Sequence, residues 1–267
     1  IFWLANAVAG ERAAIFAGFA ASSSVLILYW SHRGASDLGL STFITVSLGC
    51  FWLGANCESS KRKRRLLWMI GYFAAGMGML YKMPMPLACV GFPAFLYVLL
   101  RKKWKLLLDP WHLLGIVLFM LPWMPWAVSV LWTEPTALAK WRVEFLDRFT
   151  GNLPNVEEQK RWHFYFLYLI PTFFYPVPYS LSIPAAIVRG FRERIGVNRD
   201  GLAFMLIWFF GMFMFFTAST GKELRYFLPA MPPVFVLLGL ELAAFFDPQR
   251  VTSPRVVRLG VAAACIA

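Results

Sequence analysis

The sequence is poor in the residues that build metal sites and disulfides. Its 267 residues include four cysteines and three histidines. Three cysteines lie inside apolar stretches, the fourth ends one, and no pair has metal or disulfide spacing; they are Cys50, Cys89, Cys265 and Cys57. His32 likewise has no second histidine at metal-ligand spacing. We therefore interpret the cysteines as small apolar side chains without chemistry.

Acidic residues are also scarce, with 14 Asp and Glu against 26 Lys and Arg and a net charge of +12. In a soluble protein this excess would suggest a nucleic-acid partner. Here the charges lie in loops, and the apolar stretches hold almost none apart from Glu241. We therefore predict no nucleic-acid partner, and interpret the cations as a topology signal that also attracts anionic membrane lipids.

Apolar residues are abundant: 59% of the chain is hydrophobic and 18% is aromatic. Such a composition exceeds what a soluble core of this length needs, and it predicts an all-α, polytopic transmembrane helical bundle. We predict about eight complete spans, each of roughly 20 mostly apolar residues or somewhat fewer. They are Ala13–Trp30, Leu40–Asn56, Leu66–Leu80, Pro84–Leu100, His112–Trp132, Trp162–Val188, Leu202–Ala218 and Tyr226–Phe246.

The two ends of the chain look like partial spans. The sequence starts at Ile1, and its last residues, VAAACIA, lie in an apolar run that begins near Val256. We expect residues 1–267 to form one transmembrane domain that is a piece of a longer protein, without the first spans, the first outer loop and a C-terminal part. No signal peptide can be assessed in such a piece.

Lysine and arginine alternate between the two sides of the predicted spans. One set of loops carries KRKRR (Lys61–Arg65), RKKWK (Arg101–Lys105) and RGFRER (Arg189–Arg194), while the opposite set is poor in unmatched cations. Since cationic short loops stay in the cytoplasm, the first set is predicted to be cytoplasmic. The turns around Asp37, Lys82 and Arg225 then lie on the outer face.

Residues 133–161 form a long outer loop in which acids and bases nearly balance. Trp141, Phe145 and Phe149 recur at helical spacing, which predicts an amphipathic helix lying in the membrane interface. Arg148, on this helix, points either toward a cavity or into a solvated, salt-bridged face.

The short outer turns each place a charge near bilayer depth, where charges usually face a cavity or a partner. Lys82 interrupts MLYKMPMP and is either a phosphate-binding cation or a snorkelling anchor. Lys222 and Arg225 are spaced i, i+3, so on a helical turn both would project from one side and suit a phosphate. Glu223 could instead pair with one of them. Asp37 could orient a hydroxyl, bind a cation, act as a base or cap a helix.

These motifs, in this order, resemble the polytopic glycosyltransferases that use a polyprenyl-phosphate-linked sugar, a group that includes protein O-mannosyltransferases and the lipid A aminoarabinose transferase. The most specific match is TGKELRYFLPAMPPVFVLLG, which is similar to the family's Lys-x-x-Arg-Tyr-Leu-Leu-Pro signature. The others are SHRGASDLGLSTFITVSL (Ser31–Leu48), GMLYKMP (Gly78–Pro84), LPWMPW (Leu121–Trp126) and FLDRFTG (Phe145–Gly151).

The resemblance implies a GT-C fold in a bacterial-type inner membrane, with an active face on the periplasmic side. It implies inverting transfer from a polyprenyl-phosphate sugar donor to a lipid or protein acceptor. The phosphate-binding residues would be Lys82, Lys222, Arg225 and Arg148; Asp37 would be an acid near the sugar or acceptor; and Tyr226, Tyr81 and His163 would line the site. No cofactor is certain, and a need for a divalent metal stays open.

The sequence also departs from the family's pattern. Tyr81 and Met83 stand where the family has Thr and Gly, and either Gln159 or His163 corresponds to a histidine in the long loop. The family's acidic base lies in a first outer loop that precedes Ile1, so we expect this piece to be inactive alone. The rival interpretations are a transporter or lipid flippase, although no inverted repeat is visible, and a non-catalytic membrane subunit.

Overall fold

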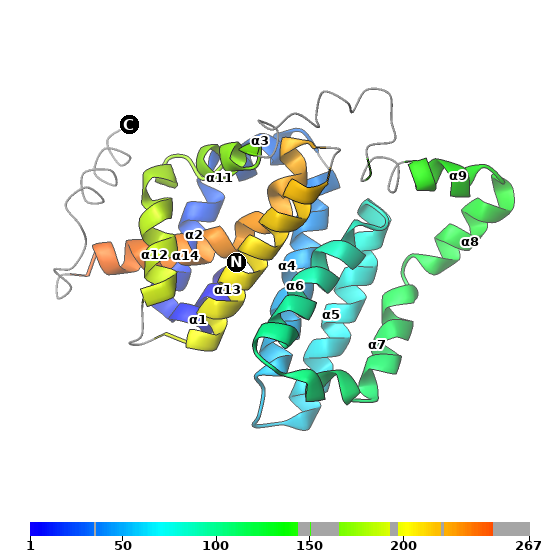
Figure 1. Cartoon of the computed structure of the whole chain (residues 1–267), viewed down its shortest axis with the longest axis horizontal. Coiled ribbons are helices and arrows are strands. Elements are labelled where there is room, and N and C mark those ends of the chain that lie inside the picture. The colour runs from blue at the N-terminus through cyan, green and yellow to red at the C-terminus, as the bar shows by residue number, and fades with distance from the viewer. Residues whose placement is uncertain (35, 144–149, 151–165, 193–196, 220–221, 248–267) are drawn as a thin grey trace. The chain divides into compact units, whose positions relative to one another are not determined.

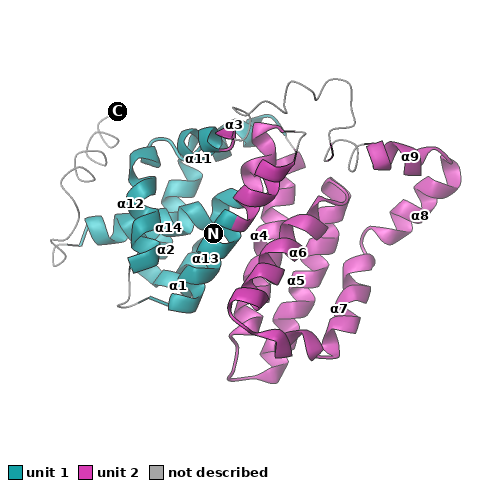
Figure 2. Ribbon diagram, in the orientation of Figure 1, with its two compact units in different colours: residues 1–35, 169–210, 230–267 teal, residues 36–168, 211–229 magenta. Residues whose placement is uncertain are grey.

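The computed structural model describes residues 1–34, 36–143, 150, 166–192, 197–219 and 222–247. In this part of the chain every regular element is a helix, as Figure 1 shows, and the prediction of an all-α bundle is confirmed. The described residues divide into two compact units (Figure 2). Unit 1 comprises residues 1–35, 169–210 and 230–267, and unit 2 comprises residues 36–168 and 211–229.

Unit 1 contains α1 (Phe2–Ala9), α2 (Glu11–Ser22), α3 (Val25–His32), α11 (Leu169–Phe174), η5 (Tyr179–Ser182), α12 (Ile183–Arg192), the first part of α13 (Arg199–Ala218) and α14 (Met231–Phe245). Its centre is α14, which packs against α1, α2 and α12. Gly239 lets α2 approach closely, because a Cβ there would lie 2.3 Å from the carbonyl oxygen of Ala13. Glu241, the acid that the sequence places inside a span, is buried and forms an ion pair with Arg189.

Unit 2 contains α4 (Ser36–Ala55), α5 (Lys61–Tyr81), α6 (Met85–Leu100), η1 (Trp104–Leu108), α7 (Trp111–Met120), α8 (Met124–Thr133), α9 (Ala137–Arg142), the end of α13 and most of η6 (Leu224–Ala230). Helix α5 packs against α4, α6 and α7, as the magenta ribbon of Figure 2 shows. At the α5–α7 contact, a Cβ added to Gly76 would lie only 2.2 Å from the carbonyl oxygen of Phe119. A glycine is therefore required where these two helices touch.

The helices long and apolar enough to cross a membrane lie where spans were predicted. Among the described residues, three qualify singly: Ser36–Ala55, Arg199–Ala218 and Leu224–Phe245. Two bent pairs, Glu11–Ser22 with Val25–His32 (47°) and Trp111–Met120 with Met124–Thr133 (45°), bring the number to five if each pair is one span. The chain is thus a multi-pass membrane protein. The full set of about eight spans stays a prediction.

Besides the two bent pairs, a third predicted span is interrupted among the described residues. Of Trp162–Val188, residues 166–188 are described; a turn separates α11 from η5, and η5 leads directly into the start of α12. Four prolines explain the breaks, because proline lacks the backbone N–H and its ring clashes with the preceding turn; they are Pro171, Pro176, Pro178 and Pro184.

The long loop is described only at its start. There α9 forms, and the ring of Trp141 lies 5.9 Å from that of Trp126 on α8. Residues 144–149 and 151–165 lie outside the described residues. The interfacial helix and the loop's bounds, 133–161, therefore remain predictions.

Candidate functional site

Asp37 is the centre of a charged cluster within unit 2. It lies in the first turn of α4, where the helix dipole favours a negative charge, and only 3% of the residue is exposed. Its Oδ1 accepts a hydrogen bond from Lys82 Nζ at 3.0 Å, and its Oδ2 lies 3.7 Å from Arg225 Nε. One buried carboxylate thus holds two cations that come from distant parts of the sequence.

Lys82 follows the last residue of α5 and reaches both Asp37 and an aromatic ring. Its ammonium nitrogen lies 3.9 Å from the centre of the Tyr226 ring, a cation–π contact. The Lys82 side chain is 29% exposed, so its charge is held inside the molecule and still accessible from outside. This arrangement differs from a snorkelling anchor, whose charge reaches into water or lipid headgroups.

Arg225 and Tyr226 share a second carboxylate, that of Glu223. Arg225 Nε lies 2.5 Å from Glu223 Oε2, and the Tyr226 hydroxyl donates a hydrogen bond to Glu223 Oε1 at 3.2 Å. Burial by itself would raise the pKa of Glu223, but the hydrogen bonds from Arg225 and Tyr226 and the charges of Arg225 and Lys82 outweigh it and lower the pKa. The carboxyl group is therefore ionised at neutral pH.

The 3₁₀ turn that carries Arg225 and Tyr226 is fixed by its apolar neighbours. Phe227 is fully buried, and its ring stacks on Tyr168 with centres 5.2 Å apart and meets Phe213 edge-on at 5.9 Å. The Ser41 hydroxyl on α4 donates a hydrogen bond to the Leu228 carbonyl at 3.2 Å. These contacts hold η6 against α4, so that Arg225 stands beside Asp37.

Lys222 lies in a different environment from the one that its spacing predicts. The η6 turn begins at Leu224, so Lys222 and Arg225 do not share a helical turn, and that interpretation is wrong. Lys222 is 5% exposed, and its ammonium donates hydrogen bonds to the carbonyls of Thr217, at 2.8 Å, and Ser219. Burial lowers the pKa of Lys222. These contacts satisfy carbonyls at the end of α13, which lack partners within the helix.

The remaining site predictions are less closely tied to the cluster. The Tyr81 side chain packs on α4: its ring lies 5.6 Å from Phe43, and a Cβ on Gly39 would come within 2.3 Å of it. Arg148 and His163 lie outside the described residues. The described part of the chain contains no group of three His, Cys, Asp or Glu side chains that could hold a metal ion.

Each unit contains a cavity lined by described residues. In unit 2 an apolar cavity of about 470 Å³ is lined by residues of α4, α5, α6 and α7, and Pro86 and Leu87 on its wall follow Lys82 closely in sequence. Its polar side chains include His112, whose ring nitrogens lie within hydrogen-bond distance of Tyr72 Oη (3.0 Å) and the Leu106 carbonyl (2.8 Å). His112 is therefore already paired, whereas the buried Trp68 Nε1–H on the same wall has no hydrogen-bond partner among the described residues. The rest of the wall is mostly apolar and suits an apolar occupant.

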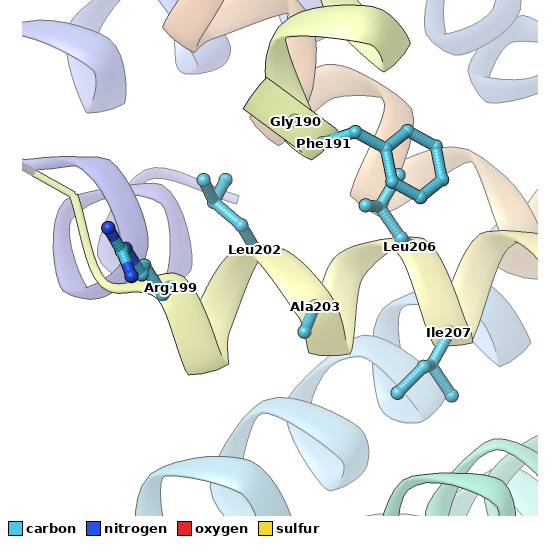
Figure 3. Close-up of a pocket in the computed structure, with 7 residues that line it drawn as sticks. All are labelled: Gly190, Phe191, Arg199, Leu202, Ala203, Leu206 and Ile207. Carbon is cyan, nitrogen blue, oxygen red and sulfur yellow. The ribbon is translucent and has the colours of Figure 1, made fainter. Parts of the chain in front are cut away.

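The second cavity, of about 410 Å³, lies in unit 1 between α12 and α13. Figure 3 shows apolar side chains such as Leu202, Leu206 and Ile207 along α13, with Arg199 at one end. It shares no residue with the Asp37 cluster. A single exposed arginine beside an apolar wall does not identify a class of ligand or a reaction for this cavity.

The fold and the cluster define a class: multi-pass, all-α membrane proteins with clustered cations held by a buried carboxylate. A model of the family "Dolichyl-phosphate-mannose-protein mannosyltransferase" matches residues 1–129. The chain is also homologous to proteins named undecaprenyl phosphate-alpha-4-amino-4-deoxy-L-arabinose arabinosyl transferase. That of Yersinia enterocolitica is 28% identical over 90% of this chain and 42% of its own length, and that of Enterobacter sp. is 26% identical over 97% and 45%.

Solved structures support the same relationship at the level of the fold. The crystal structure of ArnT from Cupriavidus metallidurans bound to undecaprenyl phosphate matches 99% of this chain and 46% of that chain, with a TM-score of 0.81 and 23% identity. Its apo state gives a TM-score of 0.74. The resemblance to polytopic membrane glycosyltransferases is confirmed. The chain spans less than half the length of the curated relatives that it matches.

Proposed function

We propose that the full-length protein containing this chain transfers a sugar from a polyprenyl-phosphate donor to a lipid or protein acceptor, with inversion at the anomeric carbon. The names of the relatives favour an undecaprenyl-phosphate-linked 4-amino-4-deoxy-L-arabinose as donor. The observation that carries the proposal is that Lys82 and Arg225 both contact the same buried carboxylate, that of Asp37. The alternating loop charges favour the periplasmic face of the inner membrane as its location.

In this reaction an acceptor nucleophile attacks the anomeric carbon while the bond to the phosphate oxygen breaks. Negative charge then develops on the departing polyprenyl phosphate. Fixed cations stabilise such charge strongly where water is largely excluded. Arg225 would bind phosphate oxygens through its planar guanidinium group, and Lys82 would act as a point charge.

The contacts of Asp37 favour a positioning role. Both of its carboxylate oxygens lie near cations, Oδ1 near Lys82 and Oδ2 near Arg225, and its side chain is 4% exposed. An acid held in this way is poorly placed to take a proton from an acceptor hydroxyl. We propose that Asp37 sets the separation and direction of the two cations. The base then comes from elsewhere in the full-length protein.

The apolar cavity in unit 2 supports a lipid substrate. Several prenyl units are purely apolar, and transferring them from water to such a wall is favourable. Pro86 and Leu87 line the cavity at the start of α6, directly after the turn that carries Lys82. A phosphate near Lys82 with part of its chain in this cavity would satisfy both ends of the molecule.

The proposal is tested by measuring sugar transfer in membranes that contain the full-length protein and a radiolabelled undecaprenyl-phosphate sugar. We expect Lys82→Gln and Arg225→Gln each to lower the transfer rate about 100-fold or more. Matched controls are Lys105→Gln and Arg62→Gln, which are exposed and belong to the loops predicted to be cytoplasmic. Wild-type rates in both site variants would refute the assignment of these residues to the phosphate.

A further inference from the structure

Counted over the described residues, the charged cluster around Asp37 is electrically balanced before any substrate enters. Lys82 and Arg225 contribute two positive charges, and Asp37 and Glu223 contribute two negative charges. A lipid phosphate that joined all four groups would leave negative charge in excess in a partly desolvated site. Because uncompensated charge is costly there, one carboxylate must give up its place when the phosphate binds.

Of the two carboxylates, that of Glu223 is better placed to move out of the cluster when the phosphate binds. The Asp37 side chain is 4% exposed and is anchored in a long helix, whereas the Glu223 side chain is 38% exposed and lies just before η6. Arg225, which it contacts, is 41% exposed. The Glu223 carboxylate can therefore turn toward water at little cost, while Asp37 cannot.

The groups that surround the Glu223 carboxylate are also groups that commonly bind phosphate. Its oxygens lie 2.5 Å from Arg225 Nε and 3.2 Å from the Tyr226 hydroxyl, and the Lys82 charge contributes to the low pKa of the carboxyl. A guanidinium, a hydroxyl and an ammonium are common phosphate partners. The carboxylate of Glu223 thus resembles a bound anion supplied by the chain itself.

We propose that Glu223 is an internal competitor for the lipid phosphate: its carboxylate occupies Arg225 and Tyr226 in the unliganded protein and returns to them when the product leaves. This inference rests on the proposed function. It makes Glu223 a residue that weakens phosphate binding at this site, since every anion that binds there must displace it.

Competition by Glu223 for Arg225 would help the polyprenyl phosphate product to dissociate. The sugar donor is a phosphodiester with one negative charge, whereas the polyprenyl phosphate product is a monoester with a charge of about −1.5 to −2 at pH 7. The two cations alone would therefore retain the product more tightly than the donor. A carboxylate that competes for Arg225 reduces this retention and limits inhibition by product.

The experiment measures binding of tritiated undecaprenyl phosphate to the full-length protein in detergent. We expect Glu223→Gln, which removes the charge and nearly keeps the shape, to tighten binding about three- to tenfold, as loss of a competing ion pair would. It should also lower, by a similar factor, the undecaprenyl phosphate concentration that half-inhibits transfer. The matched control is Glu134→Gln, which removes an exposed glutamate paired with Lys140 at 3.7 Å and should change neither value.

Undecaprenol, which lacks the phosphate, separates competition from a structural role. Its binding should be equal in wild type and Glu223→Gln, and Glu223→Gln should have no effect in an Arg225→Gln background. Unchanged or weaker undecaprenyl phosphate binding in Glu223→Gln would overturn the inference, because a residue that merely orients Arg225 weakens binding when it is removed. If Glu223→Gln does not accumulate in membranes, Glu223→Ser provides the same comparison.

The failure of the proposed function would look different. In that case Lys82→Gln and Arg225→Gln would bind undecaprenyl phosphate as tightly as wild type. If those variants weaken binding but Glu223→Gln does not tighten it, the phosphate site stands and the competitor role is refuted.

Discussion

Asp37 shows how one buried residue can organise a site. A carboxylate that loses its contact with water is tolerated when cations replace the water, and Asp37 has Lys82 at 3.0 Å and Arg225 at 3.7 Å. Neither cation can then move without leaving the carboxylate undercompensated. The pair is thereby fixed in position before a substrate arrives, so no reorganisation is needed during the reaction.

The first prediction concerns this carboxylate. Asp37→Asn removes the charge that holds Lys82 and Arg225, so we expect a transfer rate at least about tenfold lower, together with a lower melting temperature. Transfer of a radiolabelled sugar and thermal unfolding in detergent measure the two effects. Glu58→Gln, at an exposed acid, serves as the control. A variant with both properties unchanged would show that Asp37 does not position the cations.

The second prediction concerns Lys222, whose contacts add a structural role to the phosphate role that its sequence position predicts. Lys222→Met keeps the apolar stem but leaves the carbonyls of Thr217 and Ser219 without this donor. We expect a loss of about 1–3 kcal/mol of stability, visible as a lower melting temperature in detergent. An unchanged melting temperature with complete loss of transfer would instead favour direct contact with the phosphate.

At the scale of the elements, close helix contacts position the cluster. Lys82 ends α5, and α5 can lie against α7 only because Gly76 has no side chain at the Phe119 carbonyl. The η6 turn is held by Phe227 among aromatic rings and by the Ser41 hydrogen bond. In a membrane no hydrophobic force drives helices together, so their association depends on close van der Waals packing. Small residues such as Gly76 allow this close approach.

The third prediction tests the α5–α7 contact with two glycines that both lie in helices. Gly76→Ala places a Cβ at 2.2 Å from the Phe119 carbonyl oxygen, whereas a Cβ on Gly91 of α6 meets no atom within 4 Å. Both changes gain the same intrinsic helix propensity, so their difference isolates the clash. We expect Gly76→Ala to be less stable than Gly91→Ala by about 1–3 kcal/mol in thermal unfolding. Equal stabilities would show that α7 is free to move away from α5.

At the scale of the whole molecule, the distribution of cations predicts the orientation in the membrane. Residues 61–65 form the first turn of α5 and residues 101–105 follow α6, so both clusters lie at the helix ends opposite to Lys82. The positive-inside bias places those clusters in the cytoplasm. Lys82 and Asp37 then face the outside, where the proposed transfer occurs.

The fourth prediction tests this orientation with single cysteines introduced into a background that lacks Cys50, Cys57, Cys89 and Cys265. A membrane-impermeant maleimide should label Arg33→Cys in intact cells and should label Lys63→Cys only after the cells are permeabilised. Both positions are exposed in the structure. Labelling with the reverse pattern would invert the topology and place the charged cluster in the cytoplasm.

Some of the site could be anticipated from the sequence, and some could not. Asp37, Lys82 and Arg225 were predicted to have partners because charged groups at the ends of apolar runs usually do, and the structure brings the three together. Tyr226 was assigned to the site through the family resemblance, and its ring lies beside Lys82. The sequence left open whether Glu223 pairs with a neighbouring cation, and in the structure it pairs with Arg225. The contact of Asp37 with Lys82 joins residues 45 positions apart, and no local pattern predicts such a pair.

The class of fold and the alternation of loop charge follow from the residues alone, because hydropathy and charge act locally against the bilayer. Which charges meet depends instead on long-range packing. Lys222 turns to the carbonyls of α13 and Arg225 turns to Asp37 and Glu223, although the two cations lie three residues apart. That choice depends on where η6 begins and on the aromatic packing of Phe227, both of which follow from contacts between distant segments.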